Sequence, residues 1–125
     1  MRGASEMGPK ILIADDAMFM RRVIRKALSE GGYENIAEAS DGNEVLDQYR
    51  AYRPDLVFLD ITMPGRTGLE VLEELLQEDE NAKVVMCSAI GQETVIAQAV
   101  SMGASDFITK PFRTEDLLKL VRMYV

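Results

Sequence analysis

Histidine and tryptophan are absent from this sequence, and cysteine occurs once in 125 residues. Without histidine, the chain cannot build a Ser-His-Asp or Cys-His catalytic group, a histidine-rich metal site or a histidine phosphodonor. The lone Cys87 cannot form an internal disulfide, and its place in an apolar run predicts a small buried side chain. No run approaches the roughly 20 apolar residues of a membrane span, and no signal-peptide core follows Arg2.

Basic charge is in short supply as well. The chain has 14 lysines and arginines against 21 acidic residues, which gives a net charge of −7. This balance argues against nucleic acid or an anionic membrane as a partner through bulk electrostatics. Neither G-x-x-x-x-G-K-[ST] nor G-x-G-x-x-G occurs, so nucleotide binding has no support. With 47% apolar residues, the length fits one globular domain with an ordinary core.

What the sequence does have is a set of polar side chains at the ends of short apolar runs. They are Asp15 and Asp16 after residues 11–14, Asp60 after 56–59, Ser88 after 83–87 and Lys110 after 106–109. Unbroken runs of branched residues are typical of strands buried on both faces of a parallel sheet. Because open α/β folds bind ligands at the carboxyl ends of their strands, these side chains are expected to form one site.

The chemistry of such a cluster is restricted. Two carboxylates about 4 Å apart repel by roughly 4 kcal/mol at an effective dielectric constant of about 20. Three do not all stay ionised unless a cation joins them or a pKa rises, and all-oxygen ligands suit magnesium. Lys110 can offset the charge of a transferring phosphoryl group, and Ser88 can hydrogen-bond one of its oxygens. An aspartate among these groups can be the nucleophile that forms an aspartyl phosphate.

Helical patterns alternate with the strand runs five times, without a linker or a repeat. Their apolar positions are Phe19, Val23, Ile24, Ala27 and Leu28; Val45, Leu46 and Tyr49; Leu69, Leu72, Leu75 and Leu76; Val95, Ile96, Ala99 and Val100; and Leu117, Leu118 and Val121. The second strand, near residues 36–39, is more polar and is expected at the sheet edge. This alternation predicts a three-layer α/β sandwich with right-handed crossovers.

The strand-end residues also carry a family resemblance. In order and spacing, Asp15-Asp16, Asp60, Ser88-Ala89 and Lys110-Pro111 resemble the receiver domain of bacterial two-component response regulators. Residues 15–21, 60–64 and 87–92 resemble the stand-alone chemotaxis regulators of Gram-positive and thermotogal bacteria. The resemblance implies a flavodoxin-like (βα)5 three-layer sandwich with a parallel five-stranded sheet of order 2-1-3-4-5. Residues 1–8 are expected to be a disordered leader or added tail, and 9–125 the receiver domain.

The resemblance assigns the phosphoryl acceptor and the metal ligands. Asp60 is the expected phosphoryl acceptor and also a ligand of Mg²⁺. Asp16 is expected to bind the ion directly and Asp15 to contribute through water. The backbone carbonyl of Thr62 is the remaining expected ligand. Magnesium is the only cofactor that the resemblance implies.

The remaining site residues are expected to hold the phosphoryl group, transmit the signal and set its lifetime. Lys110 and Ser88 hold phosphoryl oxygens, and the peptide bond after Lys110 is expected to be cis. Ser88 and Phe107 form the expected switch, although Phe107 also fits an ordinary core position. Thr62 and Ile90 flank the expected path of a hydrolytic water, and neither orients that water well.

The resemblance further implies a cytoplasmic, monomeric signalling protein that catalyses only its own phosphorylation and slow dephosphorylation. The expected partners are a chemotaxis-type histidine kinase, a flagellar motor switch protein and a separate phosphatase, with no nucleic acid and no membrane. A phosphorelay intermediate and a receiver that belongs to a larger regulator remain alternatives within the family.

Two alternatives lie outside the receiver family. A flavodoxin-like electron carrier would need a hydroxyl- and glycine-rich loop where this chain has Asp15-Asp16-Ala17, and tryptophan for flavin stacking is missing. A phosphohydrolase with an aspartyl nucleophile would need a D-x-D pattern, but Thr62 follows Asp60 at the second position. The electron carrier would share the expected fold, and fold alone does not fix function.

Overall fold

Strands and helices alternate regularly in the computed structural model, which describes residues 8–125. The strands are β1 (Ile11–Ala14), β2 (Ile36–Ala39), β3 (Leu56–Asp60), β4 (Val84–Ser88) and β5 (Asp106–Thr109). The helices are α2 (Met18–Glu30), α3 (Gly42–Tyr52), α4 (Gly68–Glu78), α5 (Glu93–Met102) and α6 (Thr114–Tyr124). None of these helices has the length and apolar character needed to cross a lipid bilayer. Residues 1–7, where most of the expected leader falls, lie outside the described residues.

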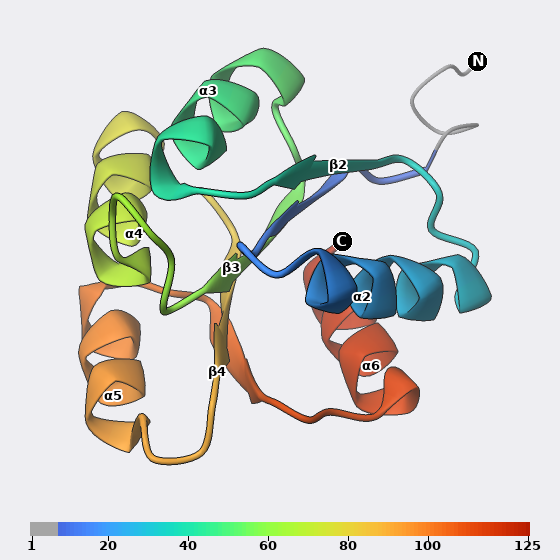
Figure 1. Ribbon diagram of the computed structural model, residues 1–125. Helices are drawn as coiled ribbons and strands as arrows, with labels where there is room; N and C mark the ends of the chain where they lie inside the picture. The colour runs from blue at the N-terminus through green and yellow to red at the C-terminus, as the bar shows by residue number, and fades with distance from the viewer. Residues whose placement is uncertain (1–7) are drawn as a thin grey trace.

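All strand pairs are parallel, and the sheet has the order β2-β1-β3-β4-β5. Figure 1 shows α3, α4 and α5 on one side of the sheet, and α2 and α6 on the other. The predicted three-layer architecture and strand order are therefore confirmed. Because every strand runs the same way, the residues that end β1, β3, β4 and β5 lie along one edge, here called the carboxyl edge.

The sheet divides the core into two clusters. Leu12, Val57 and Leu59 pack on the side of α3, α4 and α5. Ile11 and Phe58, which alternate with them, pack on the side of α2 and α6. This alternation explains why the central strands read as continuous apolar runs, since both of their faces are covered. Strand β2 is only partly buried, as its edge position requires.

Helix α2 differs from the expected apolar stripe in its first turns. Phe19 is 76% exposed and Val23 is also exposed, so the buried face consists of Ile24, Ala27 and Leu28. The helix begins at the carboxyl edge, where β1 has already ended, and its first turns therefore have less sheet to cover. Val100 is likewise exposed on α5, which lies beside the outer strands β4 and β5.

Two arginines of α2 also have a role that the amphipathic pattern does not predict. Arg21 and Arg25 both form ion pairs with Glu38 of β2, at 2.9 and 2.7 Å. The two guanidinium groups and burial act on Glu38 in opposite directions: burial raises its pKa, the arginines lower it more, and the net pKa is lowered. These contacts attach α2 to the outermost strand of the sheet.

Candidate functional site

Three carboxylates meet at the carboxyl edge. Asp15 and Asp16 follow β1, Asp60 ends β3, and each offers an oxygen within 4.8 Å of the other two. Asp15 is 2% exposed and Asp60 7% exposed, whereas Asp16 is open to solvent. The donors are carboxylate oxygens alone, so the cluster fits a hard cation such as Mg²⁺. The exposed Asp16 leaves such an ion a path from solvent.

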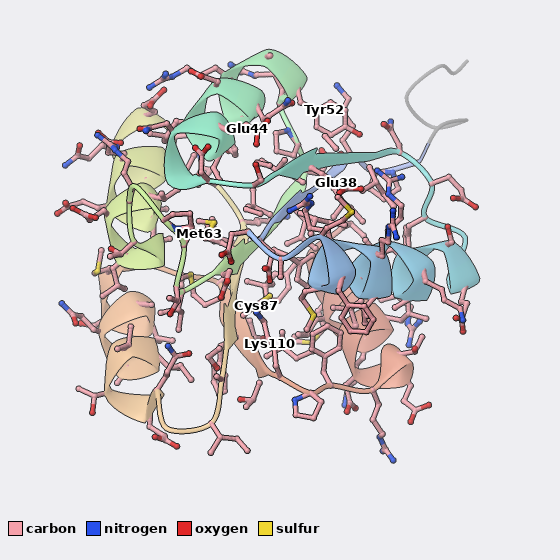
Figure 2. All side chains as sticks on the ribbon, viewed as in Figure 1. Glu38, Glu44, Tyr52, Met63, Cys87 and Lys110 are labelled. Atoms are coloured by element: carbon pink, nitrogen blue, oxygen red, sulfur yellow. The ribbon has the colours of Figure 1, made fainter. Side chains whose placement is uncertain are left out.

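Lys110 lies among these carboxylates, as the sequence predicts from its position after β5. Its Nζ is 2.9 Å from Asp15 Oδ2 and 3.3 Å from Asp60 Oδ1. Burial lowers the pKa of Lys110, but the hydrogen bond to Asp15 and the charges of both acids raise it more. The net effect is a raised pKa. The ammonium group therefore stays charged and compensates part of the negative charge. Figure 2 shows Lys110 close to Cys87 in the middle of the molecule.

The ionised form of Asp60 remains disfavoured in spite of this ammonium group. Burial raises the pKa of Asp60, the charge of Lys110 partly offsets that effect, and Asp15 raises the pKa further. The backbone N–H of Thr62 donates a hydrogen bond to Asp60 Oδ1 at 3.3 Å. The net pKa of Asp60 is raised, which means that its negative charge is unfavourable here. A bound cation, or a covalent bond that removes the charge, therefore stabilises the site.

Ser88 is the least satisfied polar residue of the site. The residue is fully buried at the end of β4, and its Oγ has no hydrogen-bond partner among the described residues. Its backbone is firmly held, since the carbonyl of Ser88 accepts a hydrogen bond from the N–H of Lys110 at 2.7 Å. A buried hydroxyl without a partner costs about 1–3 kcal/mol. The Oγ of Ser88 is therefore available to bind an incoming polar group.

Local backbone geometry fixes the position of the site residues. The Oδ1 of Asp15 accepts a hydrogen bond from the N–H of Ala17 at 2.9 Å, just before α2 begins. Arg21 donates a hydrogen bond to the carbonyl of Asp15 at 2.7 Å. The Lys110–Pro111 peptide bond is cis, as expected from the family resemblance. The two hydrogen bonds of Asp15 hold its carboxylate and its backbone in place before any ligand arrives.

Phe107 and Ile90 lie on the surface beside the site rather than in the core. Phe107 is 44% exposed and Ile90 is 81% exposed. An apolar groove of about 610 Å³ is lined by both residues together with Ile96 and Val100 of α5. The interpretation of Phe107 as an ordinary core residue is therefore wrong. Its expected role in the switch stays a prediction.

Cys87 has the buried position that the sequence predicts. It pairs with Asp60 across β3 and β4, and it is fully enclosed. Burial raises the pKa of Cys87 to about 12, with smaller opposing effects of Lys110 and the two acids. The thiol is therefore protonated and inert at neutral pH, and it takes no part in the chemistry of the site.

Gln92 is a site residue that sequence reasoning missed. Its side-chain Oε1 accepts a hydrogen bond from the N–H of Ala89 at 2.6 Å, and its Nε2 donates to Thr62 Oγ1 at 3.1 Å. The loops after β3 and β4 are thus joined by one side chain. No periodicity or strand-end position marks this residue, because the contact joins residues 30 positions apart.

The comparisons with known proteins agree with this geometry. Residues 11–122 match the response regulator receiver domain family. The chain therefore belongs to the response regulator receiver family, whose members are signalling domains rather than ordinary enzymes.

Several relatives are similar over most of their length. The chemotaxis protein CheY of Thermotoga maritima is 43% identical over 107 residues, which cover 86% of this chain and 89% of that protein. CheY of Bacillus subtilis is 44% identical over 115 residues, with 92% and 96% covered. Sporulation initiation phosphotransferase F of Bacillus subtilis is 34% identical over 119 residues, with 95% of both chains covered. Sequence similarity thus extends to chemotaxis proteins and to a phosphotransferase.

Solved structures of receiver domains share this flavodoxin-like fold. The CheX–CheY–BeF₃–Mg²⁺ complex from Borrelia burgdorferi matches with a TM-score of 0.89 and 31% identity, covering 97% of this chain and 92% of that one. The receiver domain of NtrX from Brucella abortus matches with a TM-score of 0.87 and 33% identity, covering 92% and 97%.

Proposed function

We propose that this protein is a phosphorylation-activated switch of a two-component system, which accepts a phosphoryl group on Asp60 in the presence of Mg²⁺. One observation carries the proposal: a buried acid with a raised pKa lies beside two further acids, the ammonium group of Lys110 and the unpartnered hydroxyl of Ser88. The receiver family provides the donor, which is a phosphohistidine on a partner kinase.

In the transfer step, a carboxylate oxygen of Asp60 attacks phosphorus. A new O–P bond forms, the N–P bond of the phosphohistidine breaks, and its electron pair returns to the imidazole nitrogen. Asp15, Asp16, Asp60 and the carbonyl of Thr62 would hold Mg²⁺, which offsets negative charge when bound. Lys110 is already 3.3 Å from Asp60 Oδ1, so its charge balances the phosphoryl oxygens as they arrive. The hydroxyl of Ser88 donates a hydrogen bond to one of these oxygens.

The phosphorylated state is read out through Ser88 and Phe107. When the Ser88 hydroxyl turns toward the phosphoryl group, space opens for the half-exposed ring of Phe107. One hydrogen bond and partial ring burial together favour the new state by about 2–4 kcal/mol. The population then shifts by tens- to several-hundred-fold, which changes the surface formed by β5, α5 and α6.

The CheY relatives support chemotaxis as the biological setting. A chemotaxis-type histidine kinase is then the phosphodonor, and a flagellar motor switch protein is the target of the phosphorylated monomer in the cytoplasm. Thr62 and Ile90, beside the path of a hydrolytic water, carry neither an acid nor an amide to orient that water. Self-dephosphorylation is therefore slow, and a separate phosphatase ends the signal.

A phosphorelay intermediate is the second candidate function. The 34% identity to sporulation initiation phosphotransferase F favours it. The two functions differ in where the phosphoryl group goes. An intermediate passes it to a histidine on a second protein, whereas a motor regulator keeps it while bound to the switch protein. Pull-down of native partners with and without phosphorylation distinguishes them.

The central test uses a small phosphodonor such as acetyl phosphate, with and without Mg²⁺. Intact-protein and peptide mass spectrometry should find one phosphoryl group, on Asp60, only when Mg²⁺ is present. Asp60→Asn should abolish the adduct, while the exposed control Asp47→Asn on α3 should keep it. An equal adduct in Asp60→Asn would falsify the assignment of the acceptor.

A further inference from the structure

The side chain of Gln92 joins the two loops that leave the site at β3 and β4. It occupies the position just before α5, and its own carbonyl accepts the N–H of Ile96 at 2.9 Å. The preceding Gly91 has a φ of 95°, in the left-handed region that favours glycine. This turn directs the chain from β4 back over the sheet edge, so that the amide of Gln92 reaches Thr62 and Ala89.

The contact uses both ends of the amide, and its direction is fixed. The N–H of Ala89 can only donate, so the group 2.6 Å away must be the oxygen of Gln92. The amide nitrogen then faces Thr62 Oγ1 at 3.1 Å, where it donates. A cavity of about 270 Å³ with Met63, Leu69 and Val95 in its wall lies beside this contact. We call the Thr62–Gln92–Ala89 contact the Gln92 bridge.

The Gln92 bridge continues into the site at both of its ends. At one end, the N–H of Thr62 donates to Asp60 Oδ1 at 3.3 Å. At the other end, Ala89 directly follows Ser88, whose Oγ has no hydrogen-bond partner within the described part of the chain. A chain of contacts therefore runs from the acceptor carboxylate to the residue beside the hydroxyl. Its outer part joins the loop after β3 to the loop after β4.

We propose that Gln92 is a positioning residue that limits the access of water to a phosphoryl group on Asp60. This inference rests on the proposed function above. In hydrolysis, a water oxygen attacks phosphorus, the O–P bond to Asp60 breaks with its electron pair returning to the carboxylate, and inorganic phosphate and a proton leave. The Gln92 bridge holds the loops that carry Thr62 and Ile90 at a fixed separation. Without it the loops separate, and water reaches phosphorus more often.

The test compares the lifetime of the phosphoryl group in the wild type and five variants after phosphorylation by acetyl phosphate and removal of the donor. Gln92→Met keeps the length of the side chain but removes both hydrogen bonds, and Thr62→Val removes only the acceptor. Gln98→Met, at an exposed position of α5, is the matched control, and Thr62→Ser restores the hydroxyl. The double variant Gln92→Met/Thr62→Val completes a thermodynamic cycle.

Gln92→Met should shorten the lifetime by at least about fivefold, because a fivefold change corresponds to one lost hydrogen bond and this variant loses two. Thr62→Val should shorten it similarly, and the double variant should be no faster than the faster single variant. Thr62→Ser, which keeps an accepting hydroxyl, should have a longer lifetime than Thr62→Val, and Gln98→Met should match the wild type. Amide hydrogen exchange of Ala89 should also speed up about fivefold in Gln92→Met, with exchange in β3 unchanged.

Three outcomes overturn the inference. An unchanged lifetime in Gln92→Met is the first, and independent, multiplying effects in the double variant are the second. An Ala89 amide that exchanges equally fast in both proteins is the third. The proposed function fails separately: a wild-type Asp60 that takes up no phosphoryl group overturns that function and this inference with it. An adduct with an unchanged lifetime overturns the inference alone.

Discussion

The two edges of the sheet differ in whether their polar groups have hydrogen-bond partners. At the amino edge, where the strands begin, the hydroxyl of Tyr49 donates to Asp79 Oδ2 at 2.9 Å. The hydroxyl of Tyr124 donates to the carbonyl of Ser105 at 2.8 Å, and Lys83 Nζ donates to the carbonyl of Tyr124 at 3.0 Å. Each of these donors has an acceptor, so this edge contributes to stability.

The carboxyl edge, in contrast, concentrates groups that disfavour the folded state. Asp60 has a raised pKa, and the hydroxyl of Ser88 is buried without a partner among residues 8–125. Lys110 compensates the acids only in part. The comparison indicates that polar groups reduce stability at the carboxyl edge, where a ligand is expected. At the amino edge, where no ligand is expected, they increase it. Removing a crowded acid or an unpaired hydroxyl at the carboxyl edge should therefore stabilise the protein, whereas removing a group that compensates its partner should destabilise it at either edge.

The largest effect is expected for Lys110→Met, because it leaves the buried Asp15 without its ion-pair partner. Loss of one partner of a buried pair costs about 3–5 kcal/mol, and the partial exposure of Lys110 reduces this to about 2–3 kcal/mol. Urea unfolding at neutral pH without Mg²⁺ measures the difference. Lys119→Met, on an exposed position of α6, is the control and should unfold like the wild type. An equal midpoint for both variants would contradict the role of Lys110.

Tyr49→Phe should destabilise the amino edge by about 1.5 kcal/mol, because a hydrogen bond to a charged acceptor is lost. Burial, followed by the contact with Asp79, raises the pKa of Tyr49 to about 12. The folded protein then binds the phenolic proton more tightly than the unfolded chain does. The stability difference between wild type and variant should therefore shrink as the pH rises from about 10 to about 12.

Thermal unfolding at several pH values measures the effect of Tyr49→Phe. Phosphorylation of Asp60 should be unchanged in this variant, since the two edges are independent. A matching loss of phosphorylation would show that the amino edge also serves the site, and would remove the contrast between the edges.

Asp60→Asn should stabilise the protein without Mg²⁺ by about 1 kcal/mol, because it removes one of the crowded charges. Since the pKa of Asp60 is raised in the folded state, the unfolded chain releases this proton first. Wild-type stability therefore falls relative to the variant as the pH rises above 3.8, and the gap is constant above the folded pKa.

Guanidinium unfolding of wild type and Asp60→Asn, from pH 3.5 to 7.5, checks this prediction. Adding Mg²⁺ should narrow the gap at neutral pH, because the proposed site offers the ion three carboxylates in the folded wild type and two in the variant. A variant less stable than the wild type at neutral pH would mean that Lys110 already compensates the acids in full.

Ser88→Ala should have the smallest effect, a stabilisation of up to about 1 kcal/mol. The substitution removes a buried hydroxyl that has no partner among residues 8–125, and the packing lost with its oxygen offsets part of the gain. Chemical unfolding of the two proteins measures the difference. Destabilisation of more than about 1.5 kcal/mol would instead show that the hydroxyl already has a partner, such as a bound water.

Much of the candidate site was predictable because strand ends follow a simple rule. Once 11–14, 56–60 and 106–109 are recognised as parallel strands, Asp15, Asp60 and Lys110 must share an edge. The order of the strands came from the family resemblance, since hydrophobic periodicity does not contain it. The D-x-x-E pattern of residues 41–44 is likewise typical of a helix start, and at the start of α3 the side chain of Asp41 accepts the N–H of Glu44 at 2.9 Å.

Contacts between distant loops were not predictable in this way, and neither was which apolar helix residues stay exposed. Phe19 fits the apolar stripe of α2, but whether sheet lies beneath it depends on where the helix begins relative to β1. The ion pairs of Arg21 and Arg25 with Glu38 depend on the packing of α2 against an edge strand. Gln92 reaches Thr62 only through a turn at Gly91, and one-dimensional patterns contain no such geometry.

The enclosed thiol of Cys87 can serve as a natural probe of local opening in this protein. It is the only cysteine in the chain and the strand partner of Asp60, and its high pKa keeps it unreactive while β4 stays closed. The rate at which a thiol reagent labels it therefore measures how often this part of the sheet exposes itself. Labelling rates with and without Mg²⁺ would give the free energy by which the ion protects the centre of the fold, with no engineered probe.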